Sequence, residues 1–257
     1  MEPGLMTHVT DGTATVTISH PAKRNAMTNA MWQALPPLLE RLAADRSIRA
    51  LVLTGAGATF CAGADIGSLR EAPEESKRLA VAAEEALAAF PRPTVAAIRG
   101  YCVGGGCQLA AACDLRFAQE GTLFGVTPSK LGIVYPASST QRLARLVGPA
   151  TAKYLLFSGE LIDTERALRT GLVDEVLPDG ELDKRVADFT SLLAQRSALT
   201  QTAAKEFVNG PGSAGRSVHW EAQERASGDT VEGVAAFLER REPRFVWPEA
   251  REGAEGR

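Results

Sequence analysis

The sequence predicts an α/β fold with a mostly parallel sheet, organised as one large domain with a helical extension. Three observations carry this prediction. Short apolar runs typical of buried strands alternate with Ala- and Glu-rich stretches that have helical spacing. Glycine-rich segments follow two of the expected strands. The chain has 257 residues, of which 45% are hydrophobic and 23% charged, so it can form a large core and has the composition of a globular protein.

The chain is expected to open with antiparallel strands. Residues 13–19 alternate small polar and apolar side chains after an Asp-Gly turn at 11–12, which is the signature of a hairpin with one buried face. A helix should follow from about Thr28. Pro36 and Pro37 interrupt its apolar pattern, so we expect the stable helix to begin at the two prolines. The apolar positions at helical spacing are Met31, Leu35, Leu38 and Leu42.

The following segments alternate between strands and helices, which indicates βαβ units, a mostly parallel sheet and right-handed crossovers. Two strands end at glycines, and prolines stop the helix between them. The second half, from about residue 150, is expected to be mainly helical. The expected elements are, in order, strand 49–54, helix 74–90, strand 94–99, helix 107–113, strand 114–118 and strand 172–177.

Charge and hydropathy exclude several classes of partner. The formal net charge is -3, and Lys and Arg are scattered without basic runs, so nucleic acid is not an expected partner. The first 25 residues carry Glu2 and Asp11 without an apolar core segment, and no later stretch approaches the length of a membrane span. We therefore expect a cytoplasmic protein that does not bind membranes.

Histidine and cysteine usage argues against metal sites and triads. Only three histidines are present, which leaves little material for a Ser-His-Asp triad or a His-rich metal site. The four cysteines lie among Ala, Gly and Val rather than in CxxC pairs, so we expect them to pack as small buried residues. No metal site is predicted.

Two glycine-bearing segments, Phe60–Ile66 and Gly100–Cys113, each follow an expected strand. They would place free backbone N–H groups at the carboxyl ends of parallel strands, where ligands of open α/β sheets sit. Gly104–Gly106 also opens a helix, whose amino terminus favours an oxygen that is or becomes negative. Neither segment spells GxGxxG or ends in Gly-Lys-Ser/Thr, which excludes the Rossmann and P-loop signatures. The alternative is that the glycines only permit close packing.

The glycine segments also belong to a set of motifs that resembles the enoyl-CoA hydratase/isomerase (crotonase) superfamily. The motifs occur in that family's order between about residues 8 and 246. They are Lys23-Arg24-Asn25-Ala26-Met27, Phe60–Ile66, Gly100–Ala110, Cys113-Asp114-Leu115, Thr140-Gln141-Arg142-Leu143, Gly171-Leu172-Val173 and Glu232–Leu238.

The resemblance implies a spiral of ββα units over residues 1–195 and a helical trimerisation region over 196–257, in a homotrimer or a dimer of trimers. It implies an acyl-CoA ligand, with coenzyme A as part of the substrate and no separate cofactor. By position, the backbone N–H groups of Ala64 and Gly105 would polarise the thioester carbonyl and hold the enolate. Lys205 would reach a neighbouring subunit's CoA phosphate, or be an ordinary exposed lysine.

The resemblance also implies contacts to coenzyme A. It places Lys23, Arg24 and Ala26 beside the pantetheine and phosphates. It places Ala62 and Ile66 near the adenine. For Lys23 and Arg24 the alternative is a solvated surface pair.

The sequence departs from the family at both catalytic glutamates of the hydratases. The first position is Gln108, and an amide holds a water or a substrate oxygen but does not exchange protons near neutral pH. The second is Pro128, which has no side-chain proton to give. Loss of both groups should leave slow hydration at best, and the change at Pro128 weakens the isomerase reading as well.

Three functions remain open: a lyase that uses other groups on an enoyl-CoA, a decarboxylase of a malonyl- or methylmalonyl-type thioester, and a CoA-thioester binding protein without catalysis. The loop before Tyr135 resembles that of methylmalonyl-CoA decarboxylases, so Tyr135 either faces a substrate carboxylate or packs under the loop. Ser138 and Ser139 replace small glycines and either add hydroxyls to the pocket or tighten the turn. Asp65 is either a structural loop residue or a base.

Overall fold

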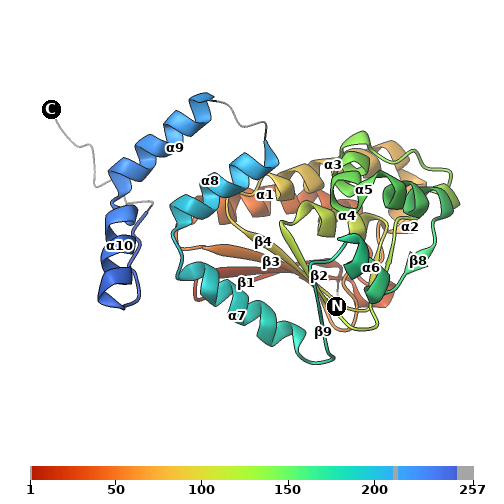
Figure 1. Ribbon diagram of the computed structural model, residues 1–257. Helices are drawn as coiled ribbons and strands as arrows, with labels where there is room; N and C mark the ends of the chain where they lie inside the picture. The colour runs from red at the N-terminus through yellow and green to blue at the C-terminus, as the bar shows by residue number, and fades with distance from the viewer. Residues whose placement is uncertain (1, 211–213, 248–257) are drawn as a thin grey trace.

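The computed structural model describes residues 2–210 and 214–247 and shows a mixed α/β fold (Figure 1). A six-stranded sheet has the order β1-β2-β3-β4-β6-β9. The β1–β2 pair is antiparallel and the other neighbours are parallel, as expected from the sequence. The strands are β1 (Gly4–Thr10), β2 (Thr13–Ser19), β3 (Ala50–Gly55), β4 (Thr94–Ile98), β6 (Leu115–Gln119) and β9 (Glu175–Leu177).

A second sheet of three strands has the order β5-β7-β8, with bounds Tyr101–Val103, Leu123–Gly125 and Leu161–Ile162. Two consecutive turns of the chain each add one strand to each sheet and then a helix. Thus β4 and β5 lead into α4 (Gly105–Ala112), and β6 and β7 lead into α5 (Ala137–Ser158). A bridge between Cys61 and Cys102 continues the small sheet into the preceding turn. The expected spiral of ββα units is confirmed.

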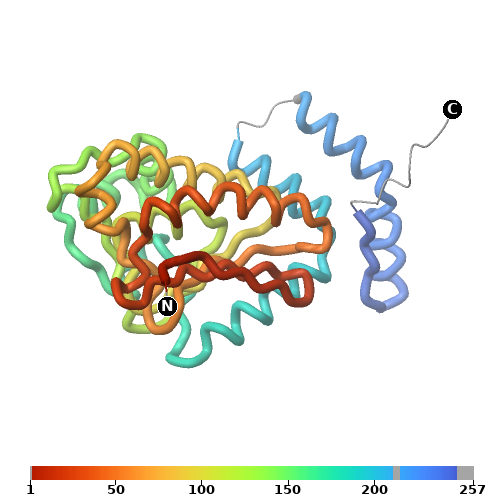
Figure 2. Tube along the Cα trace, turned by 180° about the vertical axis from the view of Figure 1, so that it is seen from behind, coloured from red at the N-terminus to blue at the C-terminus, as the bar shows by residue number. Residues whose placement is uncertain are grey.

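Helices cover both faces of the large sheet. Alternate strand residues such as Val16, Leu51 and Ala96 pack beneath α1 (Asn29–Ala44) and α3 (Pro73–Ala88). Their neighbours, such as Val52, Val95 and Phe117, pack against α7 (Leu182–Ala194) on the other face. This alternation follows from the two-residue period of a strand. Figure 2 shows β1 and β2 (red) as a hairpin at the sheet edge, next to α1.

The prediction that the first helix begins at the prolines is wrong, because α1 runs unbroken from Asn29 through Pro36 and Pro37. Thr28 caps it by accepting a hydrogen bond from the Met31 backbone N–H at 3.3 Å. Each internal proline costs about 3 kcal/mol. Burial stabilises by about 1.5–3 kcal/mol per side chain, and six side chains of α1 are buried, so packing outweighs the prolines. These are Met31, Trp32, Leu35, Leu38, Leu39 and Leu42.

Two other expected elements have different bounds. The helix after the triple glycine begins at Gly105 itself, because Gly104 has a φ of 54° and ends the extended backbone there. The strand expected at 172–177 is paired only over Glu175–Leu177, since α6 (Thr164–Thr170) ends at Gly171 and the next residues fold back onto it. A short helix, α2 (Ile66–Glu71), precedes α3.

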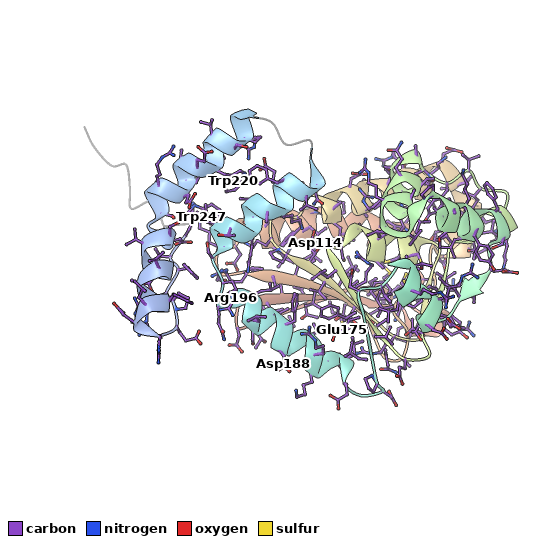
Figure 3. The ribbon with its side chains drawn as sticks, in the orientation of Figure 1. Asp114, Glu175, Asp188, Arg196, Trp220 and Trp247 are labelled. Atoms are coloured by element: carbon purple, nitrogen blue, oxygen red, sulfur yellow. The ribbon has the colours of Figure 1, made fainter. Side chains whose placement is uncertain are left out.

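Within the described residues, three helices follow the connection at residues 195–197. They are α8 (Ala198–Asn209), α9 (Ala214–Ser227) and α10 (Asp229–Glu239). Figure 1 shows α9 and α10 at the far end of the molecule from α2. Trp220 packs edge-on against Trp247, with ring centroids 6.0 Å apart (Figure 3). Residues 248–257 of the expected trimerisation region lie outside the described part of the chain. No described helix combines the length and apolarity of a membrane span.

Lys205 is not the exposed surface lysine that was one of the two expectations for it. Its Nζ donates to Asp114 Oδ2 at 2.7 Å and to the Arg92 carbonyl at 2.9 Å, and only 11% of its side chain is exposed. The expectation of an ordinary exposed lysine is therefore wrong. This half-buried ion pair holds α8 to the residue before β6, and the contact with a neighbouring subunit's CoA phosphate stays a prediction.

Candidate active site

A pocket of about 160 Å³ lies where the two glycine-bearing turns meet α2, α3 and the loop before α5. These elements come together at the right of Figure 1. Its walls are mostly apolar, and Lys77 is the one charged side chain among the described residues that line it. The pocket-lining residues include Trp32, Ala64, Leu69, Gly105, Gln108, Pro128, Leu131 and Tyr135.

Ala64 and Gly105 lie next to each other at this pocket. A parallel bridge pairs Met27 with Ala64. In it, Met27 N–H donates to the Gly63 carbonyl and Asp65 N–H donates to the Met27 carbonyl, each at 2.8 Å, so the N–H of Ala64 takes no part. Gly105 is the first residue of α4, where backbone N–H groups have no helical partner. A Cβ placed on Gly105 would lie 3.5 Å from Ala64 N. Neither N–H donates a backbone hydrogen bond within the described ranges.

Close approach of the two turns requires glycine at two positions. A Cβ on Gly106 would lie 2.2 Å from the Cys61 carbonyl oxygen, which no real side chain tolerates. Gly63 has a φ of 106°, a conformation that L-residues rarely adopt. The glycines thus serve packing, which the sequence left open, and in doing so they bring two free amides to one pocket.

The segment 24–27 runs beside 62–65, so the residues expected to contact coenzyme A do come together. Ala62 N–H donates to the Arg24 carbonyl at 3.0 Å. Arg24 is exposed, and its guanidinium lies over the Tyr101 ring, 4.8 Å from the centroid. Ala26 is buried beneath this strip, whereas Ile66 is 61% exposed at the pocket edge.

Asp65 is tied into the loop rather than free in the pocket. Its Oδ1 accepts from the Ser68 backbone N–H at 3.1 Å and caps α2, and its Oδ2 accepts from Lys23 Nζ at 2.6 Å. The hydrogen bond from Lys23 lowers the pKa of the Asp65 carboxyl. Asp65 does not line the pocket.

The two substituted positions, Gln108 and Pro128, both line the pocket, as does Tyr135. The Tyr135 hydroxyl donates to the Gly104 carbonyl at 3.3 Å. Burial raises the pKa of this phenol well above its usual range, so it keeps its proton and remains a donor. No carboxylate is found among the described pocket residues.

Glu84 was missed by the sequence analysis. It lies on α3, is fully buried, and contacts Gln108, Ser139 and Arg142 directly behind the pocket. Glu84 lies one turn before Leu87 and one turn after Ala80, on the inner face of α3. Helical spacing alone could therefore have predicted that this glutamate is buried. Its partners come from 24 to 58 residues further along the chain, which no local pattern reveals.

The four cysteines are free thiols and buried, so their prediction as small packing residues is confirmed. Burial raises the pKa of Cys61 to about 12 and that of Cys102 as well, which keeps both as unreactive thiols. Over the described ranges, no three His, Cys, Asp or Glu side chains gather as metal ligands would.

Comparison with known proteins gives one consistent match. The family model for enoyl-CoA hydratase/isomerase matches residues 8–247. The 2,3-dehydroadipyl-CoA hydratase of Escherichia coli is 36% identical over 244 residues, which are 90% of this chain and 93% of that protein.

Solved structures agree. The crystal structure of an enoyl-CoA hydratase/isomerase family member superposes with a TM-score of 0.93 at 36% identity, covering 97% of this chain and 99% of that one. The enoyl-CoA hydratase of Bacillus anthracis superposes with a TM-score of 0.86 at 29% identity, covering 94% and 98%.

Proposed function

The chain belongs to the enoyl-CoA hydratase/isomerase family of acyl-CoA-processing enzymes, and from that premise we propose that it stabilises the enolate of an acyl-CoA thioester between the backbone N–H groups of Ala64 and Gly105. The adjacency of these two unpaired amides at one apolar pocket carries the proposal. Donors fixed before the reaction cost no reorganisation, and one such donor accelerates a reaction about 10²–10³-fold. The amino terminus of α4 adds to the stabilisation of a negative oxygen.

The bound coenzyme A would follow the strip formed by residues 24–27 and 62–66. Lys23 and Arg24 are exposed near the pocket and would lie along the pantetheine and phosphates with Ala26. Ala62 and the exposed Ile66 would contact the adenine. The Lys23–Asp65 bond would hold this strip in place, and Lys23 keeps donor capacity for a phosphate because its ammonium has three hydrogens.

Proton transfer has to differ from that of a hydratase with two glutamates. Gln108 and Pro128 line the pocket, but neither side chain gives or takes a proton near neutral pH, and no described carboxylate replaces them there. General acid–base catalysis contributes about 10²–10⁴-fold, so hydration without it would be slow. The enolate-stabilising amides do not depend on either side chain.

Decarboxylation of a malonyl-type thioester is the second candidate, favoured by the combination of Tyr135 and Lys77 in a pocket free of carboxylates. The C–C bond to the carboxylate would break and CO₂ would leave. The electron pair of that bond would stay on the acyl part and form the thioester enolate, whose oxygen the two amides would stabilise. No base is needed for this step. The Lys77 cation would attract the substrate carboxylate, whereas a pocket glutamate would repel it. The Tyr135 hydroxyl would donate a hydrogen bond to that carboxylate in exchange for its 3.3 Å bond to the Gly104 carbonyl.

Incubation of the protein with crotonyl-CoA and with methylmalonyl-CoA, followed by product chromatography, tests these functions. Turnover of either thioester supports an enolate-stabilising enzyme, and the product tells hydration from decarboxylation. Tight binding without turnover would instead indicate a CoA-thioester binding protein. Absence of binding to both thioesters would overturn the proposal.

We also propose that the C-terminal helices form a homotrimer or a dimer of trimers. A hollow of about 680 Å³ opens between α8, α9 and α10. Val231, Val234, Phe237 and Leu238 on α10 expose 56–83% of their surface, and such clustered apolar side chains mark an interface. Sedimentation analysis would show a trimer or hexamer, and a monomer would refute the assembly.

A further inference from the structure

A satisfied, buried carboxylate lies behind the pocket rather than in it. Glu84 on α3 is 0% exposed. Its Oε2 accepts hydrogen bonds from Gln108 Nε2 and Ser139 Oγ, and its Oε1 accepts one from the Arg142 guanidinium. A buried carboxylate is tolerated when it is paired and hydrogen-bonded in this way. With all three donors supplied by α4 and α5, Glu84 has no need of a ligand.

The same contacts fix the side-chain amide of Gln108. Its Nε2 donates to Glu84 and also to Ser139 Oγ at 2.9 Å, which uses both amide hydrogens on groups outside the pocket lining. Its Oε1 accepts no hydrogen bond from any residue within the described ranges, although Gln108 lines the pocket. The reversed amide would turn its oxygen toward the carboxylate of Glu84, with no proton between two acceptors.

We propose that Glu84 is a positioning residue, which holds Gln108 with its carbonyl oxygen toward the acyl pocket, where that oxygen accepts a hydrogen bond from a hydroxyl group on the acyl chain. This inference rests on the proposed function, because it needs the thioester carbonyl at Ala64 and Gly105. Gln108 follows Gly105 by about one helical turn, so it reaches acyl carbons close to the thioester. The ligands favoured by this arrangement are 3-hydroxyacyl thioesters.

Calorimetric titration of the full-length chain with butyryl-CoA and 3-hydroxybutyryl-CoA tests the proposal, because these ligands differ by one hydroxyl. We expect the hydroxylated ligand to bind about fivefold more tightly, as one neutral hydrogen bond allows. In Glu84→Gln the new amide has both a donor and an acceptor, so it can hydrogen-bond to Gln108 in either orientation of the Gln108 amide. The affinity ratio should fall to about one, while butyryl-CoA binding stays unchanged. Gln108→Met should remove the preference in the same way.

Glu85→Gln is the matched control. Glu85 is the next residue of α3 and also accepts from Arg142, through Nη2 at 3.3 Å, but it is exposed and does not touch Gln108. Its variant should keep the fivefold ratio. If Glu84→Gln fails to fold because Arg142 loses its buried ion partner, the double variant Glu84→Gln/Arg142→Met removes the guanidinium charge and gives the same test.

Each contrary result has a distinct meaning. Equal affinity of the parent protein for the two ligands would show that the Gln108 oxygen does not face the acyl chain. An unchanged ratio in Glu84→Gln would show that Glu84 does not orient the amide. An equal loss of both affinities would reduce Glu84 to a structural role. Failure of the parent protein to bind butyryl-CoA, crotonyl-CoA and methylmalonyl-CoA alike would instead overturn the proposed function itself.

Discussion

Gly105→Ala tests the two-amide site most sharply among single substitutions. The added methyl would lie 3.5 Å from Ala64 N, and we expect it to crowd an oxygen that is bound to both amides. It would also lie 3.0 Å from Trp32 Cζ2, and the Trp32 side chain is buried. Alanine keeps its backbone N–H, but a methyl that pushes the oxygen away from one of the two donors should cost nearly as much as losing that donor, about 2.7–4 kcal/mol in the transition state, so kcat should fall about 10²–10³-fold.

The stability of the same variant should change much less. Alanine gains up to about 1 kcal/mol over glycine in a helix, whereas the contact with Trp32 costs about 1–3 kcal/mol. We therefore expect a folded protein with a free energy of unfolding lower by at most about 2 kcal/mol. Gly4→Ala, whose methyl would meet nothing within 4 Å, is the control.

The assay is turnover of the thioester that the parent protein converts, together with urea unfolding of each variant. A folded Gly105→Ala variant that keeps kcat within about threefold of the parent would refute the reasoning, because an effect that small is far below the loss expected for one donor. If Gly105→Ala does not fold, Ala64→Pro is the second probe of the same two donors, because proline lacks the backbone N–H at position 64. Its affinity for the thioester should then be measured.

Three further predictions concern the pocket and its rim. Gln108→Glu should raise hydration of crotonyl-CoA by no more than about tenfold, because Pro128 remains and the new carboxylate faces Glu84; full recovery would show that the second position is dispensable. Asp65→Asn should lower the free energy of unfolding by at most about 1 kcal/mol at pH 7, because asparagine still caps α2 but lacks the charge that pairs with Lys23. Because Lys23 lowers the folded-state pKa of Asp65, this difference should shrink as the pH falls below about 4, and urea unfolding at both pH values checks it; a difference independent of pH would contradict the ion pair. Tyr135→Phe should slow decarboxylation of methylmalonyl-CoA about 10- to 100-fold and leave crotonyl-CoA turnover unchanged. Since burial raises the pKa of Tyr135, kcat of the parent should show no loss from phenol ionisation up to about pH 10; equal effects on both thioesters would rule out recognition of the carboxylate.

The strands and glycine turns were predictable because their signals are local. Apolar runs ending at glycine predicted β3 and β4 nearly to the residue, and the triple glycine indicated a helix there, although α4 begins two residues before the expected 107. The first helix was mispredicted because the rule for internal prolines considers the backbone alone, whereas α1 is held by the core against its buried face.

The site was only partly predictable, because its remaining parts depend on contacts between distant segments. The identity of position 108 as glutamine was evident from the sequence, but the orientation of its amide depends on Glu84, Ser139 and Arg142. Lys205 likewise finds Asp114, 91 residues away, and leaves the solvent. The spacing of residues along the chain does not predict such long-range pairs.

The polarisation of the thioester carbonyl by Ala64 and Gly105 can be measured directly. Isotope-edited infrared spectroscopy of butyryl-CoA, with carbon-13 in the thioester carbonyl, reports the strength of that C=O bond in the bound state. Two hydrogen bonds from the backbone should shift the stretch of the bound ligand to lower frequency, and Gly105→Ala should reverse most of the shift. An identical frequency for free and bound ligand would contradict the account.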